Sequence, residues 1–183
     1  MHRQPSGKIR GFTLIELIFA IAIIAILCAI SLPALGSLMQ SSQSRSTNTQ
    51  LLTALNLARI TAVSRESEIV ICPSADQKNC DASPWWQHGW IVFDDRDRNG
   101  KRNGDEPVLN VAQAQPGMAV ESSSGREHVT YRIDGSATGT NLTFTLCDRR
   151  GAAYANTIVV SNSGRPRQAP ATPAQAAAAC AGL

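Results

Sequence analysis

The sequence predicts an α+β protein in which one long N-terminal helix packs on antiparallel β-sheet. Three observations predict this fold. An apolar run over residues 12–35 is long enough to cross a bilayer, a polar segment with a helical apolar stripe follows it, and short strand-like runs between turn residues begin after residue 65. A chain of 183 residues favours one soluble domain behind the apolar run. We therefore expect a basic N-terminal segment over 1–11, a transmembrane segment over 12–38, and a head over 39–183.

The first element is an apolar helix. Residues 17–30 contain no polar residue, and a bilayer core of about 30 Å needs roughly 20 largely apolar helical residues. A secretory signal also begins with a basic segment and an apolar core, but its cleavage site follows that core. Here the Gly11–Phe12 junction precedes the core. Glu16 is unusual for a passive anchor, because a carboxylate in hydrocarbon costs a few kcal/mol and usually marks a partner.

The second element continues the first. Residues 40–50 are polar throughout and leave the membrane. Apolar residues then recur at Leu51, Leu55, Ala58 and Ala62, which is the spacing of one helical face. The spacing predicts a single helix over 12–63 whose second half packs on the sheet.

The remaining elements are strands. Runs of β-type residues separated by glycine, asparagine and aspartate predict antiparallel strands, and they lie at 68–72, 89–93, 107–111, 118–121, 128–133, 141–146 and 157–161. The tail over 168–183 is rich in alanine and proline, and we expect it to be disordered unless Cys180 ties it down.

The net charge of +3 belongs to the basic N-terminal segment over 1–11. Arg3, Lys8 and Arg10 stand there without an acid, and the rest of the chain holds 14 basic and 14 acidic residues. A neutral head has no global attraction for nucleic acid, so binding would need a local patch.

Cysteine usage indicates disulfides. Cys28 lies in the apolar helix, where a thiol behaves as a small hydrophobe. Cys72, Cys80, Cys147 and Cys180 remain, an even number in a domain exported to an oxidising compartment. Of three pairings, proximity suggests Cys72–Cys80 and Cys147–Cys180. Zinc is the alternative, but no CxxC or histidine clamp accompanies the cysteines.

Residues 95–106 match the pattern of a calcium-binding EF-hand loop. Asp95, Asp97, Asn99 and Glu106 would supply oxygens, and Gly100 would allow the sharp turn. A hairpin turn built on Asn-Gly and Asx chemistry is the alternative that we favour, because the preceding residues form a strand pattern and cations lie inside the loop. These cations are Arg96, Arg98, Lys101 and Arg102.

Neither aromatic nor titratable residues indicate catalysis or a cofactor. Trp85, Trp86 and Trp90 precede the loop; exposed aromatics stack on bases, but beside a strand we expect core packing. His88 and His128 have no acid or nucleophile in a recognisable arrangement. We predict a protein that is not an enzyme.

The C-terminal part carries a local basic excess. Arg149, Arg150, Arg165 and Arg167 stand against Asp148 alone after Cys147. Arginine's planar fork suits phosphate oxygens, and Arg165 and Arg167 in an extended segment point to one side. If the two strands pair, we expect all four arginines to lie together. A solvated charged turn explains the same residues equally well.

The N-terminus resembles the class III signal of type IV pilins and type II secretion pseudopilins. In that family a prepilin peptidase cuts after the glycine, here Gly11, and methylates the new terminal residue, here Phe12. The resemblance therefore implies that 1–11 is a cleaved leader and that the transmembrane segment over 12–38 also serves in assembly. The family's glutamate, here Glu16, meets the N-terminal amine of a neighbouring subunit. The resemblance implies other pilins as partners, a single-pass inner-membrane location with the head in the periplasm, and later assembly into an extracellular pilus.

The whole chain resembles the GspH/FimT branch of pseudopilins. The matching segments are Gly-Phe-Thr-Leu-Ile-Glu-Leu, Ile-Val-Ile-Cys-Pro, Gly-Trp-Ile-Val-Phe, Cys-Asp-Arg-Arg-Gly and Ile-Val-Val-Ser. A C-terminal GRxR motif marks the FimT minor pilins of natural transformation, and Gly164-Arg165-Pro166-Arg167 fits it. The resemblance implies non-specific binding of double-stranded DNA through Arg165 and Arg167, with Arg149 and Arg150 assisting. The alternatives are a GspH-like pseudopilin of type II secretion, a priming subunit without a ligand, and a calcium-modulated adhesin.

Overall fold

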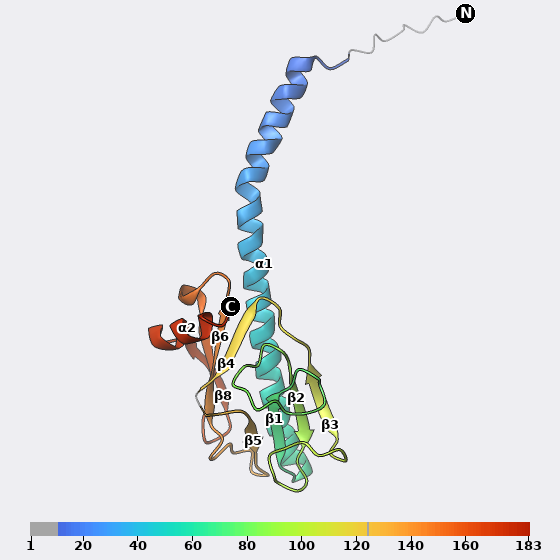
Figure 1. Ribbon diagram of the computed structural model, residues 1–183, viewed down its shortest axis with the longest axis vertical. Coiled ribbons are helices and arrows are strands. Elements are labelled where there is room, and N and C mark those ends of the chain that lie inside the picture. The colour runs from blue at the N-terminus through green and yellow to red at the C-terminus, as the bar shows by residue number, and fades with distance from the viewer. Residues whose placement is uncertain (1–10, 124) are drawn as a thin grey trace, which may run out of the picture. The chain divides into compact units, whose positions relative to one another are not determined.

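A long helix and two antiparallel sheets make up the protein (Figure 1). The computed structural model describes residues 11–123 and 125–183, with only the helical backbone described at 31–34. The leader prediction for 1–11 therefore falls outside the described residues except at Gly11. The chain divides into two compact units, residues 1–39 and 40–183.

Helix α1 spans Leu14–Arg65, so it begins two residues after the predicted helix over 12–63 and ends two residues beyond it. In the first unit the large apolar side chains that the structure describes, between Leu14 and Met39, are exposed. By length and hydropathy α1 is a helix that can cross a membrane. In the second unit Leu51, Leu55 and Ala58 are fully buried. Core packing of this stripe, as predicted, gives the helix most of its stability there.

The strands form two four-stranded sheets, in the orders β3-β2-β1-β5 and β4-β6-β7-β8. All seven predicted strands are present, with ends shifted by up to two residues. Every pairing is antiparallel. The strands are β1 (Ile69–Pro73), β2 (Trp90–Asp94), β3 (Val108–Ala112), β4 (Met118–Ser122), β5 (Val129–Tyr131), β6 (Leu142–Asp148), β7 (Asn156–Val160) and β8 (Pro166–Pro170).

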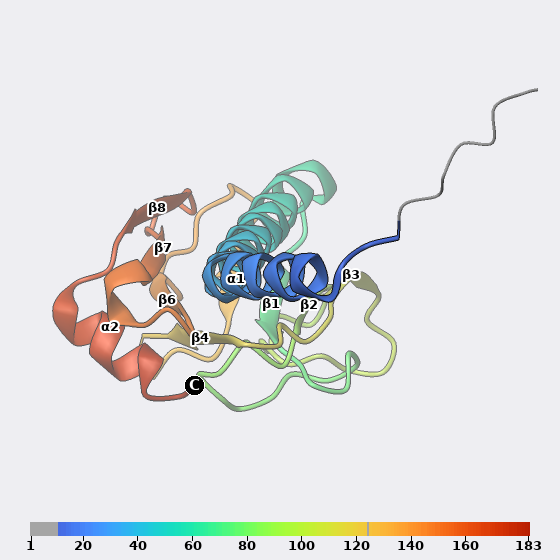
Figure 2. The same ribbon diagram turned by 90° about the horizontal axis from the view of Figure 1, so that it is seen from above.

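One main core joins the second half of α1 to the inner faces of both sheets. Figure 2 shows β6–β8 on one side of that part of α1 and β1–β3 on the other. Alternate strand residues enter the core, such as Phe144 and Leu146 of β6 and Ile158 of β7. Trp86 and Trp90 are fully buried, and the ring of Trp86 meets Phe144 edge-on at 4.8 Å. Two of the three tryptophans therefore fill the core, as expected.

The sequence did not predict β8 or helix α2 (Pro173–Cys180). Prolines at both ends of β8 made the segment look unlike a strand, but proline is tolerated in an edge strand. The start of α2 does carry a readable signal. Thr172 caps the helix, Pro173 follows, and the side chain of Gln175 accepts a hydrogen bond from the Thr172 backbone.

Candidate nucleic-acid interface

The turn between β7 and β8 positions the arginine motif. The Gly164 N–H donates to the Ser161 carbonyl at 2.8 Å, and Gly164 has a φ of +75°. A Cβ at Gly164 would lie 2.0 Å from the Gly135 carbonyl oxygen and 3.2 Å from Cε1 of Tyr131. Gly164 is thus required for the close packing of its turn against the loop at Gly135. This packing sets the backbone position of the next residue, Arg165.

Arg165 and Arg167 extend outward from an edge strand. Arg167 lies opposite Val159 of β7, and Figure 2 shows β8 at the outer edge of its sheet. Gln168 faces α1, since its Nε2 donates to Oδ1 of Asn48 at 2.7 Å. By strand alternation Arg167 therefore points away from α1, and Arg165 directly precedes the strand. Both side chains are exposed, and neither guanidinium forms a hydrogen bond or ion pair with a described residue.

Arg149 and Arg150 do not join them, so the expectation of one four-arginine patch is wrong. β6 and β7 do pair, but antiparallel pairing brings the end of β6 to the start of β7. Arg165 follows the end of β7 instead. Arg167 lies opposite Val159, which in turn lies opposite Thr143 of β6. Thr143 is five residues before Asp148, so Arg167 is about 17 Å from the end of β6, measured along the strands.

Arg150 is also engaged elsewhere. Its Nε and a terminal nitrogen donate to the two carboxylate oxygens of Asp148 at 3.0 and 2.7 Å. The guanidinium lies 4.5 Å from the ring centre of Tyr154. Burial pushes the pKa of Asp148 up, but the hydrogen bonds from Arg150 outweigh burial and the net pKa is lowered. Arg150 therefore neutralises a buried acid and is not available to phosphate.

We expect Arg150→Ala to lower the free energy of unfolding at pH 7 by about 2 kcal/mol, because it leaves the buried Asp148 carboxylate without its cation. A depressed pKa stabilises the fold above the unfolded value of about 4, and the contribution is lost as pH falls through the folded pKa. Denaturant unfolding of wild type and variant at pH 7 and at pH 3 checks this. A stability difference that does not shrink in acid would contradict it.

The structure also brings an arginine that sequence reasoning missed to the motif. Nε of Arg59 on α1 donates to the Gly135 carbonyl at 3.0 Å, the oxygen against which Gly164 packs. Arg59 lies beside the predicted apolar stripe of α1, and no local spacing in the sequence relates it to Gly164. Only the contact between the two loops places it beside Gly164.

The 95–106 loop joins β2 to β3 as a hairpin connection. One carboxylate oxygen each of Asp95, Asp97 and Glu106 lies within 4.8 Å of the others. These carboxylates already accept backbone N–H groups of the loop: Asp95 from Gly100 at 2.8 Å, and Glu106 from Arg96 and Asn103 at 2.8 Å each. Burial raises the pKa of Asp95. These are the contacts of the Asx-rich turn that the sequence favoured over calcium binding.

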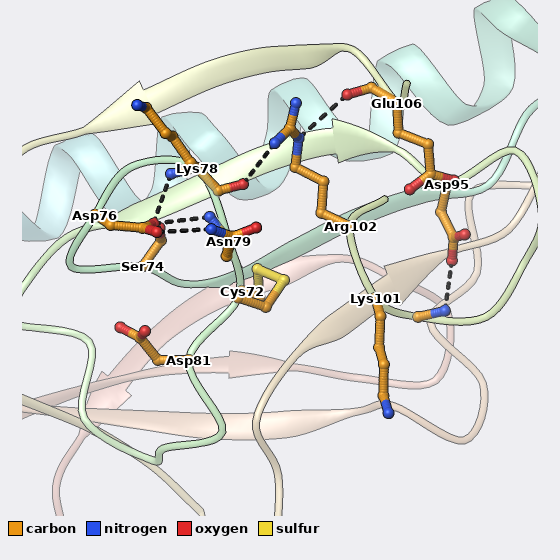
Figure 3. The surroundings of a disulfide bond; sticks show 12 residues. Cys72, Ser74, Asp76, Lys78, Asn79, Asp81, Asp95, Lys101, Arg102 and Glu106 are labelled. Atoms are coloured by element: carbon orange, nitrogen blue, oxygen red, sulfur yellow. Dashed lines mark hydrogen bonds between the residues drawn. A yellow bond between two sulfur atoms is a disulfide. The ribbon is translucent and has the colours of Figure 1, made fainter. Parts of the chain in front are cut away.

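One loop cation has a structural role beside the first disulfide (Figure 3). Arg102 donates to the Lys78 carbonyl at 2.8 Å and to the Glu106 carbonyl at 3.2 Å, so it ties the 95–106 loop to the Cys72–Cys80 loop. The structure contains Cys72–Cys80 and Cys147–Cys180, the pairing that proximity suggested. The second of these joins β6 to the end of α2.

At the other end of the chain, Phe12 is 89% exposed. The Glu16 carboxylate accepts hydrogen bonds from the backbone and hydroxyl of Thr13, at 3.1 and 3.0 Å. The Thr13 hydroxyl in turn accepts the Glu16 N–H at 3.4 Å, which completes a capping box at the start of α1.

Comparison with known proteins gives two sequence matches. Residues 47–164 match the family described as type II transport protein GspH, and residues 7–32 match the prokaryotic N-terminal methylation motif. The first match ends at Gly164 and does not extend over Arg165 and Arg167. No curated protein matches the chain at a significant level.

Solved structures are similar in fold. The minor type IV pilin FimU of Pseudomonas aeruginosa strain PAO1, in space group P65, is 22% identical, with a TM-score of 0.53 over 69% of this chain and 92% of FimU. Its P21 form is 19% identical, with a TM-score of 0.53 over 79% and 97%. The minor pseudopilin EpsH of the Vibrio cholerae type 2 secretion system is 10% identical, with a TM-score of 0.49 over 70% and 97%.

Proposed function

Since the chain belongs to the GspH family of type IV pilin-like proteins, we propose that it is a minor pilin of the FimT kind, whose head binds extracellular double-stranded DNA. Members of this family are structural subunits and not enzymes. Before assembly the apolar half of α1 would hold the subunit in the inner membrane. After cleavage at Gly11 by a prepilin peptidase, it would join other pilins in an extracellular fibre. Retraction would then draw bound DNA toward the periplasm in natural transformation.

One observation supports this proposal above the others. The side chains of Arg165 and Arg167 are exposed and have no hydrogen-bond or ion-pair partner among the described residues, and they lie at the start of a strand with restricted backbone. Pro166 and Pro170 bound that strand, and its register with β7 is fixed along its length. The two guanidinium groups therefore need little ordering before they meet phosphate oxygens. Contacts of this kind are independent of base sequence and fall with salt. Single-site affinity would be micromolar or weaker, so several copies along a fibre add avidity.

We expect Arg165→Ala/Arg167→Ala to weaken binding of a random duplex roughly 100-fold, about tenfold for each lost phosphate contact. Gel shifts at low salt would use the full chain in detergent, co-expressed with a prepilin peptidase. Intact mass must show that 1–11 is gone, because Arg3, Lys8 and Arg10 would otherwise bind DNA themselves.

Arg149→Ala is the matched control, since this exposed arginine lies at the far end of the sheet. It should bind as wild type does. Equal affinity of wild type and the double variant, or no binding by wild type at low salt, would refute the proposal.

The alternative is a structural subunit, either a GspH-like pseudopilin of type II secretion or a priming minor pilin without a ligand. The family's description as a type II transport protein favours it. The two roles differ in the phenotype of a deletion strain. Loss of exoprotein secretion with normal transformation would favour the structural subunit, and loss of transformation with normal secretion would favour the DNA-binding pilin.

A further inference from the structure

Helix α1 carries two arginines on the side that faces β8. Arg45 and Arg59 are 14 residues apart, which in an α-helix is about 21 Å along the axis and about 40° around it. Arg45 lines a groove of 620 Å³ with Asn48 of α1 and with Gln168 and Pro170 of β8. Arg59 reaches the Gly135 carbonyl beside Gly164. The two arginines thus flank the two ends of the same edge strand.

The strand between them is held firmly to the helix. At the Arg45 end, Asn48 accepts a hydrogen bond from Gln168 at 2.7 Å and donates one to Asn156 at 2.6 Å. At the Arg59 end, Gly164 packs on Gly135. The helix and the strand are therefore held at a fixed spacing, with the helix arginines at the ends of β8 and Arg167 on the face of β8 that points away from α1.

We propose that α1 extends the DNA-binding surface, so that Arg45, Arg59, Arg165 and Arg167 form one basic strip along the β8 edge. This inference rests on the proposed function. None of the four is in an ion pair within the described part of the chain. The acid of the neighbouring loop, Asp134, accepts the Ser136 N–H at 2.8 Å and interacts with Arg132.

The chemistry of the strip fits the backbone of a duplex. A length of about 21 Å spans about six base pairs at 3.4 Å each, which matches a run of phosphates. Recognition of single strands relies on exposed aromatics that stack on bases. Trp86 and Trp90 are buried, and the exposed Tyr154 lies against Arg150 on the β6–β7 connection. The strip itself offers only arginines.

The salt dependence of duplex binding tests the strip. Because the slope of log K against log salt is about −0.9 per phosphate neutralised, we expect about −3.6 for the peptidase-processed full chain. Arg45→Gln should make the slope less negative by about 0.9, to about −2.7, and Arg59→Gln should do the same. Arg45 is the more direct test, because its side chain is exposed and has no hydrogen bond or ion pair with a described residue, so we expect its replacement to leave the fold intact.

Two further variants separate charge from positioning. Arg59→Lys keeps the charge and should keep the slope. If Arg59 acted only by holding Gly135, lysine and glutamine would weaken binding alike. Arg149→Gln is the control on the β4 side of the sheet, where its Nε lies 3.9 Å from the Cβ position of Gly117, and it should leave the slope unchanged.

The outcomes distinguish this inference from the proposed function. Loss of binding in Arg165→Ala/Arg167→Ala, with an unchanged slope in Arg45→Gln and Arg59→Gln, would overturn the strip and leave the DNA-binding role standing. Unchanged binding in Arg165→Ala/Arg167→Ala would overturn both.

Discussion

Gly164→Ala is expected to lower the free energy of unfolding by about 3 kcal/mol and to weaken DNA binding as well. The left-handed backbone at φ +75° costs a residue with a side chain roughly 1–2 kcal/mol. An extra methyl group in a packed site costs roughly 1–3 kcal/mol, and here it would meet the Gly135 carbonyl oxygen at 2.0 Å. Backbone must move, so the start of β8 and Arg165 with it would shift.

Thermal unfolding of the head should show a decrease in Tm of roughly 6–12 °C for this loss. Gly139→Ala is the matched control. Gly139 also has a positive φ, +88°, but a Cβ there would have no atom within 4 Å. It should therefore show only the backbone cost, about 1–2 kcal/mol. If the two variants were equally stable, the contact between Gly164 and Gly135 would not constrain the turn.

Removal of the Cys147–Cys180 disulfide is expected to have a comparable effect. A cross-link that closes 34 residues stabilises by up to about 4 kcal/mol through the entropy of the unfolded chain. Helix α2, which this disulfide anchors, is too short to stay folded without the cross-link. α2 has eight residues, of which Ala176 and Ala179 are buried, and isolated helices shorter than about 12 residues are marginal in water.

We expect Cys147→Ala/Cys180→Ala to lower the free energy of unfolding by about 3–4 kcal/mol, with early loss of hydrogen-exchange protection in α2. Cys72→Ala/Cys80→Ala is the comparison, since its loop is shorter and the same model gives about 2.6 kcal/mol. Full protection of α2 in the first variant would contradict the expectation, because packing by itself would then hold the helix.

Much of the fold followed from local patterns. The apolar stripe of α1 and seven strands were predicted within two residues, because alternation and helical spacing report which side chains meet the core. The strand β8 was not predicted. Arg167 and Gln168 are exposed, and prolines stand at both ends, so β8 has no apolar alternation to detect. The segment is a strand because its backbone pairs with the otherwise unpaired edge of β7.

The candidate site was predicted only in part, and for the same reason. Arg165 and Arg167 were found because they are neighbours in sequence. Their separation from Arg149 depends on which end of β7 meets which end of β6, a property of antiparallel pairing. The hydrogen bonds from Arg150 to Asp148 depend on the conformation of the turn that follows β6.

The apolar N-terminal helix, the order of most elements and the motif around Arg165 and Arg167 could be read from local sequence. Each of these depends on residues close together along the chain. The tertiary structure then set which cations lie near that motif. It removed Arg150 by pairing it with a buried acid, and it brought Arg59 to Gly164 across more than a hundred residues. Such contacts depend on packing between elements that are distant in sequence, so the spacing of neighbouring residues does not predict them.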